Sequence, residues 1–185
     1  MLARLLVFGV AVCVVLPQTA TPAARGYVFD GGTRAQRQVV VSALAASSFD
    51  WARVPGPVTI HIVQDARTEA TPGHIWIDAP LLDAGDFAWG VVQHEYAHQV
   101  DYLLLNDGQR DRLHRLLGGR DWCYEIAGLP HAAHGCERFA STLAWAYWPS
   151  PDNCMRPESS RDESATLQPR RFRELLESML ESNGA

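Results

Sequence analysis

The sequence predicts an α+β fold, with strands confined to its first half and helices dominating its second half. Segments 58–63 and 74–78 are short, alternate in hydropathy and contain many β-branched or aromatic residues, as is typical of strands. Five longer segments repeat apolar residues three and four positions apart, which indicates amphipathic helices. These helices are expected at residues 33–48, 87–105, 107–117, 136–148 and 169–182.

Turn residues separate the elements of the first half. Residues 25–32 contain three glycines and are expected to form a loop. Thr33 is suited to cap the first helix, because its hydroxyl can accept a hydrogen bond from the first helical turn. The strand at 74–78 comes shortly before the helix at 87–105. It is therefore either a core strand or an exposed sheet edge that could pair with an extended peptide.

The second half alternates helices with irregular segments. Asn106-Asp107-Gly108 ends the helix at 87–105, and Pro149 ends the helix at 136–148. Residues 120–135 have no regular pattern, and residues 149–168 are rich in Pro, Ser and Asp and are expected to form a long loop. Since no internal repeat is present, residues 25–185 are expected to form one domain.

Residues 1–24 have the layout of a secretory signal peptide. Arg4 precedes an uncharged apolar run from Leu5 to Leu16, and small residues follow as far as Ala24. An uncleaved membrane anchor is the alternative, but this run is short beside the roughly 20 residues that span a bilayer. The chain is therefore expected to be secreted and to have no membrane association after cleavage.

The charge of the chain argues against nucleic acid as a partner. Removal of residues 1–24 takes away one of the 16 basic residues and none of the 21 acidic ones, which leaves a net charge of −6. A mildly acidic domain without a basic cluster lacks the electrostatic footprint of a nucleic-acid-binding protein. Apolar residues make up 47% of the sequence and charged residues 20%, as in globular proteins.

Three cysteines remain after the signal segment: Cys123, Cys136 and Cys154. Export makes a disulfide plausible, and three cysteines allow three single pairings. The preferred prediction is Cys136–Cys154, because this bond would tie a loop to the helix that carries Glu137. No C-x-x-C spacing occurs, so a cysteine-rich zinc site is not expected.

The helix at 87–105 contains the sequence His94-Glu95-x-x-His98. Residues four positions apart stack on one helix face, so both imidazoles can reach one metal ion. Glu95 lies one step round the helix, where its carboxylate can act on a water molecule. Asp101 returns to the histidine face and could accept a hydrogen bond from a ligating histidine. Two histidines and an acid on a buried face need a compensating partner, and zinc provides one.

A catalytic zinc site usually has three protein ligands and one open position, so a third ligand is needed. The metzincin pattern requires Gly at position 101 and His at position 104, where this chain has Asp101 and Leu104. Glu125 lies in the irregular segment and is one candidate. Glu137 is the preferred candidate, because it begins a helix face that is otherwise small and apolar.

The motif residues resemble a known group of enzymes. His94-Glu95-x-x-His98, followed by a helical Glu137 and by Phe139-Ala140, resembles the gluzincin group of zinc metallopeptidases. Thermolysin-like and aminopeptidase-like enzymes belong to this group. The segment from His98 to Tyr102 is also similar to the metalloprotease domain of lethal-factor-type toxins. The resemblance covers roughly residues 74–148, and its gap from His98 to Glu137 is longer than in thermolysin-like enzymes.

The resemblance implies a zincin-like fold, in which a small mixed β-sheet packs on the helix of the HExxH motif. A mainly helical C-terminal part then brings the glutamate ligand. It implies a zinc metallopeptidase that cleaves peptide or protein substrates, with Zn²⁺ held by His94, His98 and Glu137. Together with the signal segment, this predicts a secreted enzyme, and a monomer is expected. Glu95 would serve as general base. The oxyanion donor would be a Tyr or His near the third ligand, and the candidates are Tyr124, His131, His134 and Tyr147, with His134 and Tyr124 preferred.

Two other interpretations remain open. The first is a zinc-binding or protein-interaction domain that has kept the scaffold without catalysis. The second is a membrane-tethered interaction domain in which the HExxH sequence is accidental. The first predicts zinc without turnover, and the second predicts no zinc.

Overall fold

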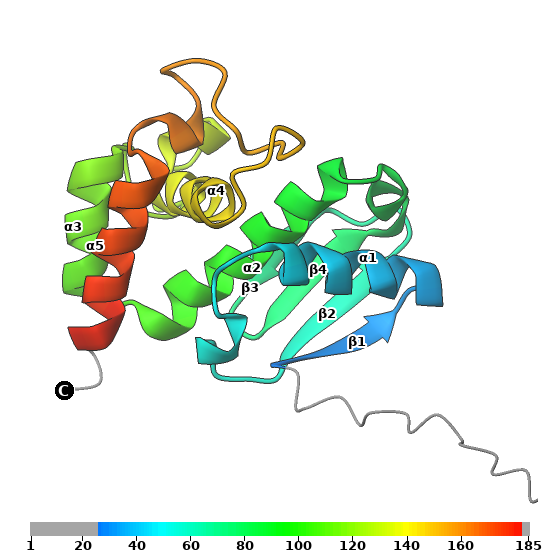
Figure 1. Cartoon of the computed structure of the whole chain (residues 1–185). Coiled ribbons are helices and arrows are strands. Elements are labelled where there is room, and N and C mark those ends of the chain that lie inside the picture. The colour runs from blue at the N-terminus through cyan, green and yellow to red at the C-terminus, as the bar shows by residue number, and fades with distance from the viewer. Residues whose placement is uncertain (1–25, 183–185) are drawn as a thin grey trace, which may run out of the picture.

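The computed structural model describes residues 26–182, and it has a mixed α+β architecture built from a four-stranded sheet and five α-helices. The signal segment predicted at residues 1–24 lies outside the described residues. Figure 1 shows helices α1 and α2 beside the sheet, whereas α3, α4 and α5 gather at the other end of the molecule. The chain therefore has a sheet-containing part and a helical part, as the sequence predicts.

The sheet has the order β1-β2-β4-β3. Strands β1 (Tyr27–Gly31), β2 (Val58–Val63) and β4 (His74–Asp78) run parallel, whereas β3 (Glu69–Thr71) is an antiparallel edge strand paired with β4. The sequence predicts β2 and β4 with the observed bounds. The strand at 74–78 has neighbours on both sides, so the sheet edge next to the predicted site is β3 instead.

The expectation of a loop at residues 25–32 is wrong, because residues 27–31 form β1. This strand pairs on one side only, and most of its residues are at least partly exposed. Its sequence contains Asp30 and Gly31, residue types that are depleted in strands. Pairing with β2, rather than a local hydrophobic alternation, therefore determines its conformation.

The five helices agree with the sequence to within two residues at each end. Their observed bounds are α1 (Arg34–Ala46), α2 (Phe87–Leu104), α3 (Asp107–Leu117), α4 (Gly135–Tyr147) and α5 (Pro169–Ser182). Thr33 caps α1 as predicted, since its hydroxyl accepts a hydrogen bond from the backbone N–H of Gln36 at 3.2 Å. The segment at 149–168 is irregular except for one 3₁₀ turn, η4 (Glu163–Ala165).

The hydrophobic core joins one sheet face to helices α1 and α2. The buried strand residues alternate along the chain, as in Val58, Ile60 and Ile62, and face the helices. From residue 92 to residue 101 every side chain of α2 is buried. Helix α4 packs against α2 from the helical part. Because this part of α2 is covered by α1, α4 and β3, the polar residues of its motif are buried.

The predicted disulfide Cys136–Cys154 is wrong: the bond joins Cys123 to Cys136, whose Cα atoms are 5.3 Å apart. The backbone explains this pairing, because the Cys136 N–H donates to the Trp122 carbonyl at 2.7 Å and brings the irregular segment against the start of α4. The free Cys154 lies elsewhere, with its Sγ 3.3 Å from the Phe87 carbonyl oxygen at the start of α2.

The disulfide indicates an oxidising environment for the folded protein. Within residues 26–182, no helix combines the length and the apolar character that crossing a membrane requires.

Candidate metal centre

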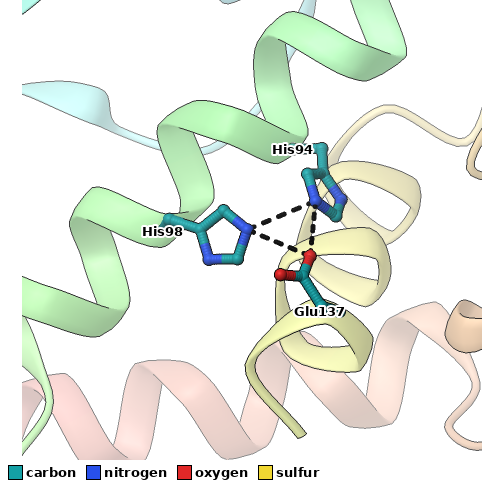
Figure 2. A group of neighbouring side chains, drawn as sticks. All are labelled: His94, His98 and Glu137. Atoms are coloured by element: carbon teal, nitrogen blue, oxygen red, sulfur yellow. Dashed lines mark hydrogen bonds and ion pairs between the residues drawn. The ribbon is translucent and has the colours of Figure 1, made fainter. Parts of the chain in front are cut away.

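His94, His98 and Glu137 meet in the interior between α2 and α4 (Figure 2). Both histidines are 4% exposed and Glu137 is 4% exposed. The two Nε2 atoms lie 3.3 Å apart, and Glu137 Oε2 is 3.0 Å from His94 Nε2 and 3.2 Å from His98 Nε2. The structure thus brings Glu137, rather than Glu125, to the histidine pair.

The helix period and the packing of small residues produce this convergence. His94 and His98 are one turn apart on α2, so their rings point in the same direction. Glu137 lies in the first turn of α4, and Ala140 and Ala144, one and two turns further along, are fully buried. Small side chains on this face allow α4 to lie close to α2, which carries the Glu137 carboxylate to the histidines.

The three donor atoms are spaced as the ligands of one metal ion would be. In a tetrahedral site with bonds of about 2.0–2.1 Å, neighbouring ligand atoms are about 3.3 Å apart. The observed separations of 3.0, 3.2 and 3.3 Å are close to this value. Two imidazole nitrogens and a carboxylate oxygen are also a donor set that zinc accepts. A cation at this point would compensate the burial of the carboxylate.

Glu95 faces the same cleft as the metal group. The cleft has a volume of about 280 Å³, and its lining includes Glu95, His98, Glu137 and the edge-strand residues Glu69 and Ala70. Burial raises the pKa of the Glu95 carboxyl, while the neighbouring histidines oppose this effect. A carboxyl with a raised pKa beside a metal site is suited to accept and release a proton.

The electrostatics of Glu137 reflect its histidine neighbours. Burial favours the protonated form, but hydrogen bonds from three histidines outweigh burial and hold the pKa of Glu137 far below its usual range. The third of these histidines is His131, whose Nε2 lies 3.0 Å from Glu137 Oε2. Hydrogen bonds to Glu137 and Glu163 raise the pKa of His131 to about 10. Without a metal ion, Glu137 is therefore an anion among hydrogen-bond donors.

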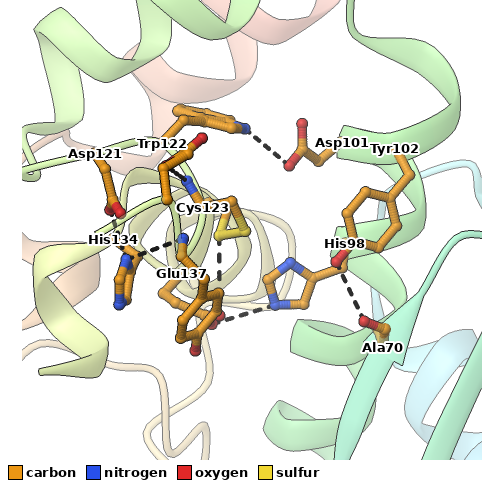
Figure 3. Close-up of a disulfide and its surroundings, with 12 residues drawn as sticks. Ala70, His98, Asp101, Tyr102, Asp121, Trp122, Cys123, His134 and Glu137 are labelled. Atoms are coloured by element: carbon orange, nitrogen blue, oxygen red, sulfur yellow. Dashed lines mark hydrogen bonds and ion pairs between the residues drawn. A yellow bond between two sulfur atoms is a disulfide. The ribbon is translucent and has the colours of Figure 1, made fainter. Parts of the chain in front are cut away.

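The two preferred candidates for the oxyanion donor, His134 and Tyr124, occupy different positions relative to the cleft. His134 is 1% exposed, and its Nδ1 pairs with Asp121 Oδ1 at 2.5 Å (Figure 3). Tyr124 lines the cleft together with Glu137 and packs on the His134 ring with centroids 4.0 Å apart. His134 therefore supports Tyr124 instead of lining the cleft itself.

The other two candidate oxyanion donors, His131 and Tyr147, also lie in different places. His131 lines the cleft, at the start of the 3₁₀ turn η3 (His131–Ala133). Tyr147 lies at the far end of α4, where its hydroxyl donates to Glu177 Oε1 at 3.0 Å. The structure thus brings Tyr124 and His131 to the metal group, whereas His134 and Tyr147 contact other residues.

Asp101 links α2 to neighbouring parts of the protein near the histidine pair. Its carboxylate accepts hydrogen bonds from Arg110 Nε at 2.7 Å and from Trp122 Nε1 at 3.1 Å (Figure 3). Asp101 is near enough to His98 to contribute to the raised pKa of that ring. The buried His98 Nδ1 nevertheless has no hydrogen-bond partner among the described residues. Asp101 therefore connects α2 to α3 and to the segment that carries Cys123.

Two further residues of α2 position the edge strand beside the cleft. Gln99 donates from Nε2 to the Thr71 carbonyl at 2.9 Å and accepts at Oε1 from the Gly73 N–H at 2.8 Å. The Tyr102 hydroxyl donates to the Ala70 carbonyl at 3.2 Å (Figure 3). The helix that carries the histidines therefore also holds the β3–β4 hairpin, a role that the sequence motif does not reveal.

Comparison of the chain with family models, with curated protein sequences and with solved structures finds no match. The interpretation of the site therefore depends on its own geometry and chemistry.

Proposed function

We propose that this chain is a secreted zinc-dependent metallopeptidase of the zincin-like type. The observation that carries the proposal is the meeting of His94, His98 and Glu137 within 4.8 Å of one another, with Glu95 in the same cleft. The architecture supports it, because a small mixed sheet packs on the HExxH helix and a helical part supplies the glutamate. The disulfide supports export.

His94, His98 and Glu137 would hold the zinc ion. When bound, zinc acts as a Lewis acid and makes water acidic enough to lose a proton near neutral pH. Glu95 accepts this proton as general base and later passes it to the leaving amine. The burial that raises the pKa of Glu95 brings its proton affinity closer to the range in which both transfers are efficient.

Tyr124 and His131 are the proposed donors to the negative charge that develops on the scissile carbonyl oxygen. Both line the cleft together with Glu137, and His131 Nε2 lies 3.0 Å from Glu137 Oε2. A donor fixed near the reacting carbon stabilises the oxyanion without reorganisation during the reaction. The disulfide is suited to hold Tyr124 close to Glu137, since Cys123 precedes Tyr124 and Cys136 precedes Glu137.

The substrate is proposed to be an extended peptide that lies along β3. This strand is the sheet edge next to the cleft, and Glu69 and Ala70 contribute to the cleft lining. An extended peptide can form main-chain hydrogen bonds with an edge strand. The scissile bond would then lie over the metal group and Glu95.

The proposal is tested with Glu95→Gln, assayed on a mixture of unstructured peptides with zinc content measured in parallel. Zinc binding and the thermal unfolding midpoint should remain close to those of the wild type. Hydrolysis should fall by about a hundredfold to ten-thousandfold, because no base remains to accept the proton. Glu125→Gln is the matched control, since Glu125 is exposed and outside the metal group.

Each contrary outcome has a distinct meaning. Near-normal hydrolysis by Glu95→Gln would refute the role of Glu95. A wild-type protein that binds zinc but hydrolyses no peptide would be a non-catalytic zinc-binding domain. A wild-type protein that binds no zinc would show that the HExxH sequence is accidental.

A further inference from the structure

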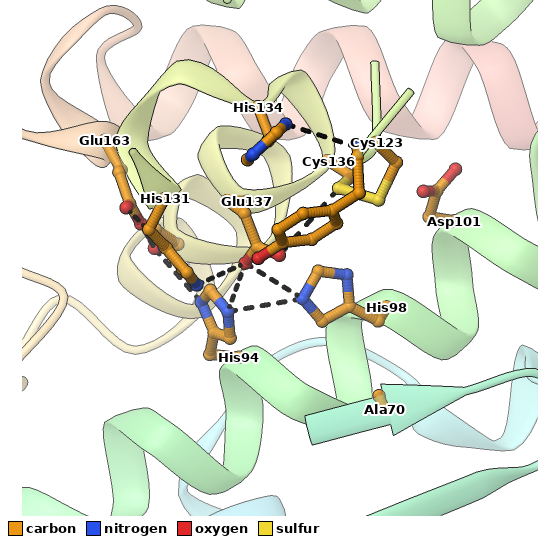
Figure 4. Close-up of polar contacts among 12 residues, drawn as sticks. Ala70, His94, His98, Asp101, Cys123, His131, His134, Cys136, Glu137 and Glu163 are labelled. Atoms are coloured by element: carbon orange, nitrogen blue, oxygen red, sulfur yellow. Dashed lines mark hydrogen bonds and ion pairs between the residues drawn. A yellow bond between two sulfur atoms is a disulfide. The ribbon is translucent and has the colours of Figure 1, made fainter. Parts of the chain in front are cut away.

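Glu163, in the irregular segment 149–168, is connected by hydrogen bonds to two histidines of the candidate site, one of them through a serine. Its Oε1 lies 2.7 Å from His131 Nδ1, and its Oε2 accepts a hydrogen bond from the Ser141 hydroxyl at 2.6 Å. The Ser141 oxygen is in turn 3.0 Å from His94 Nδ1. Figure 4 shows Glu163 reaching His131 on the side away from Glu137. One carboxylate is thus connected to His131 directly and to His94 through Ser141.

The hydrogen-bonding capacity of Ser141 fixes the direction of its two contacts. A serine hydroxyl has one hydrogen to donate, and an ionised carboxylate can only accept. The short contact to Glu163 therefore uses the Ser141 hydrogen, and the thioether sulfur of Met155 at 3.5 Å is a weaker acceptor. Ser141 must then accept from His94 Nδ1–H. This contact leaves Nε2 as the nitrogen of His94 that faces Glu137 Oε2, at 3.0 Å, and His98, where a metal ion would bind.

The same reasoning applies to His131. Because Glu163 Oε1 can only accept, the His131 Nδ1 must carry a hydrogen. This contact fixes the orientation of the ring, with Nε2 directed to Glu137 Oε2 at 3.0 Å and into the cleft. His131 has 54% of its side chain exposed, so the surrounding protein alone does not hold its ring.

Glu163 can fulfil this role because the turn around it is anchored. The neighbouring Ser164 is 3% exposed, and its hydroxyl donates to the Met155 carbonyl at 2.5 Å. Thr166 donates from its hydroxyl to the Leu117 carbonyl at 3.2 Å, and η4 packs against α4. The carboxylate is therefore fixed relative to the helix that carries both Ser141 and Glu137.

We propose that Glu163 is a positioning residue that sets the tautomer of His94 and the orientation of His131 together. The proposal deepens the proposed function, because it assigns one carboxylate to both a metal ligand and an oxyanion donor. Outer-shell acceptors of this kind fix the tautomer of ligating histidines and strengthen metal binding. The irregular segment 149–168 then supplies a functional part of the site.

The test compares Glu163→Met and Ser141→Ala with the wild type. Methionine is similar in size to glutamate but removes both acceptor oxygens. Glu158→Met is the control, since Glu158 is exposed on the same segment. Zinc affinity is measured by competition with a chelator. Nuclear magnetic resonance of the metal-free and zinc-loaded proteins detects hydrogen-bonded imidazole N–H protons, and unfolding midpoints verify that each variant is folded.

Glu163→Met should weaken zinc binding by about tenfold to a hundredfold and should lose the Nδ1–H signals of both histidines. Ser141→Ala should lose the signal of His94 alone and weaken zinc binding to a similar degree. The double variant should bind zinc about as tightly as the more impaired of the two single variants. Both changes act on His94 through the same series of hydrogen bonds, so their effects should not add. Glu158→Met should behave as the wild type.

The proposal is overturned if Glu163→Met keeps both N–H signals, or if it binds zinc as tightly as Glu158→Met does. A wild-type protein that takes up no zinc would refute the proposed function. The metal-free spectra would then decide the role of Glu163 alone, through the presence of the His131 Nδ1–H signal in the wild type and its loss in Glu163→Met. If the protein binds zinc but has no peptidase activity, zinc affinity and the imidazole N–H signals still test the role of Glu163.

Discussion

At the scale of single residues, the strongest feature is the Glu137 carboxylate, which is 4% exposed and has three imidazole nitrogens within 3.2 Å. An isolated buried carboxylate is costly, and removal of its charged partners would leave that cost uncompensated. His94 and His98 lie on one element and Glu137 on another. A ligand at their meeting point therefore depends on all three residues.

Removal of Glu137 should therefore impair zinc binding far more than removal of Glu125. Glu137→Ala should weaken zinc binding by more than the roughly tenfold to hundredfold expected for an outer-shell residue. Glu125→Ala should change it little, because Glu125 is exposed and its carboxylate accepts from the Cys123 N–H at 2.8 Å. Chelator competition on both variants measures this difference, and a stronger effect of Glu125→Ala would move the third ligand to the irregular segment.

The sequence predicts the residues of this site to different degrees for physical reasons. The helix period places His94 and His98 on one face, so their proximity follows from spacing alone. Glu137 is predictable as a carboxylate on a small apolar face. Glu163 is not, since it belongs to an irregular segment and its partners His131 and Ser141 are 32 and 22 positions away. The preference for His134 is unsupported for a similar reason, because its contact with Asp121 has no signal in the sequence.

At the scale of elements, the position of α2 depends on a close approach to the segment 149–168. Gly90 lies in the second turn of α2, and a Cβ at this position would be 2.6 Å from both Asn153 Oδ1 and Cys154 Sγ. The Asn153 amide is itself held by hydrogen bonds to the Ala144 and Trp148 carbonyls at 3.0 and 2.8 Å. The segment therefore packs against α2 because residue 90 has no side chain.

Gly90→Ala should consequently destabilise the protein, although alanine favours helices over glycine by about 1 kcal/mol. The overlap with Asn153 and Cys154 should outweigh this gain, with a net cost of about 1–3 kcal/mol as for other overpacked sites. Thermal or urea unfolding measures the change. Gly108→Ala, in the first turn of α3, is the matched control, because its nearest contact to a Cβ would be 3.4 Å. An unchanged or raised unfolding midpoint for Gly90→Ala would contradict the close packing.

The elements themselves were predictable where their pattern is local. The helices combine apolar periodicity with capping residues such as Thr33, and β2 and β4 alternate clearly. Strands β1 and β3 were missed, since each lies at a sheet edge and depends on pairing with a partner. The disulfide was mispredicted because its geometry depends on how the irregular segment returns to α4. Strand pairing and the packing of the irregular segment against α4 both depend on the tertiary structure.

At the scale of the whole molecule, the metal group lies where the two parts of the protein meet. His94 and His98 belong to α2, which packs on the sheet side, whereas Glu137 belongs to α4 of the helical part. Asp101 adds a second connection through Arg110 of α3 and Trp122. A bound ion would therefore join the two parts directly, and its contribution should appear in the stability of the whole fold.

Zinc should accordingly raise the unfolding free energy of the wild-type protein by mass action. A ligand that binds only the folded state contributes about 2.7 kcal/mol when its free concentration is a hundred times the dissociation constant. The thermal unfolding midpoint should rise with added zinc and fall on treatment with a chelator. His94→Ala and Glu137→Ala should show almost no dependence on zinc, whereas Glu95→Gln should show the full dependence because Glu95 is not a ligand. A zinc-dependent midpoint in His94→Ala equal to that of the wild type would mean that the stabilising ion binds elsewhere, and that α2 and α4 are not joined through this site.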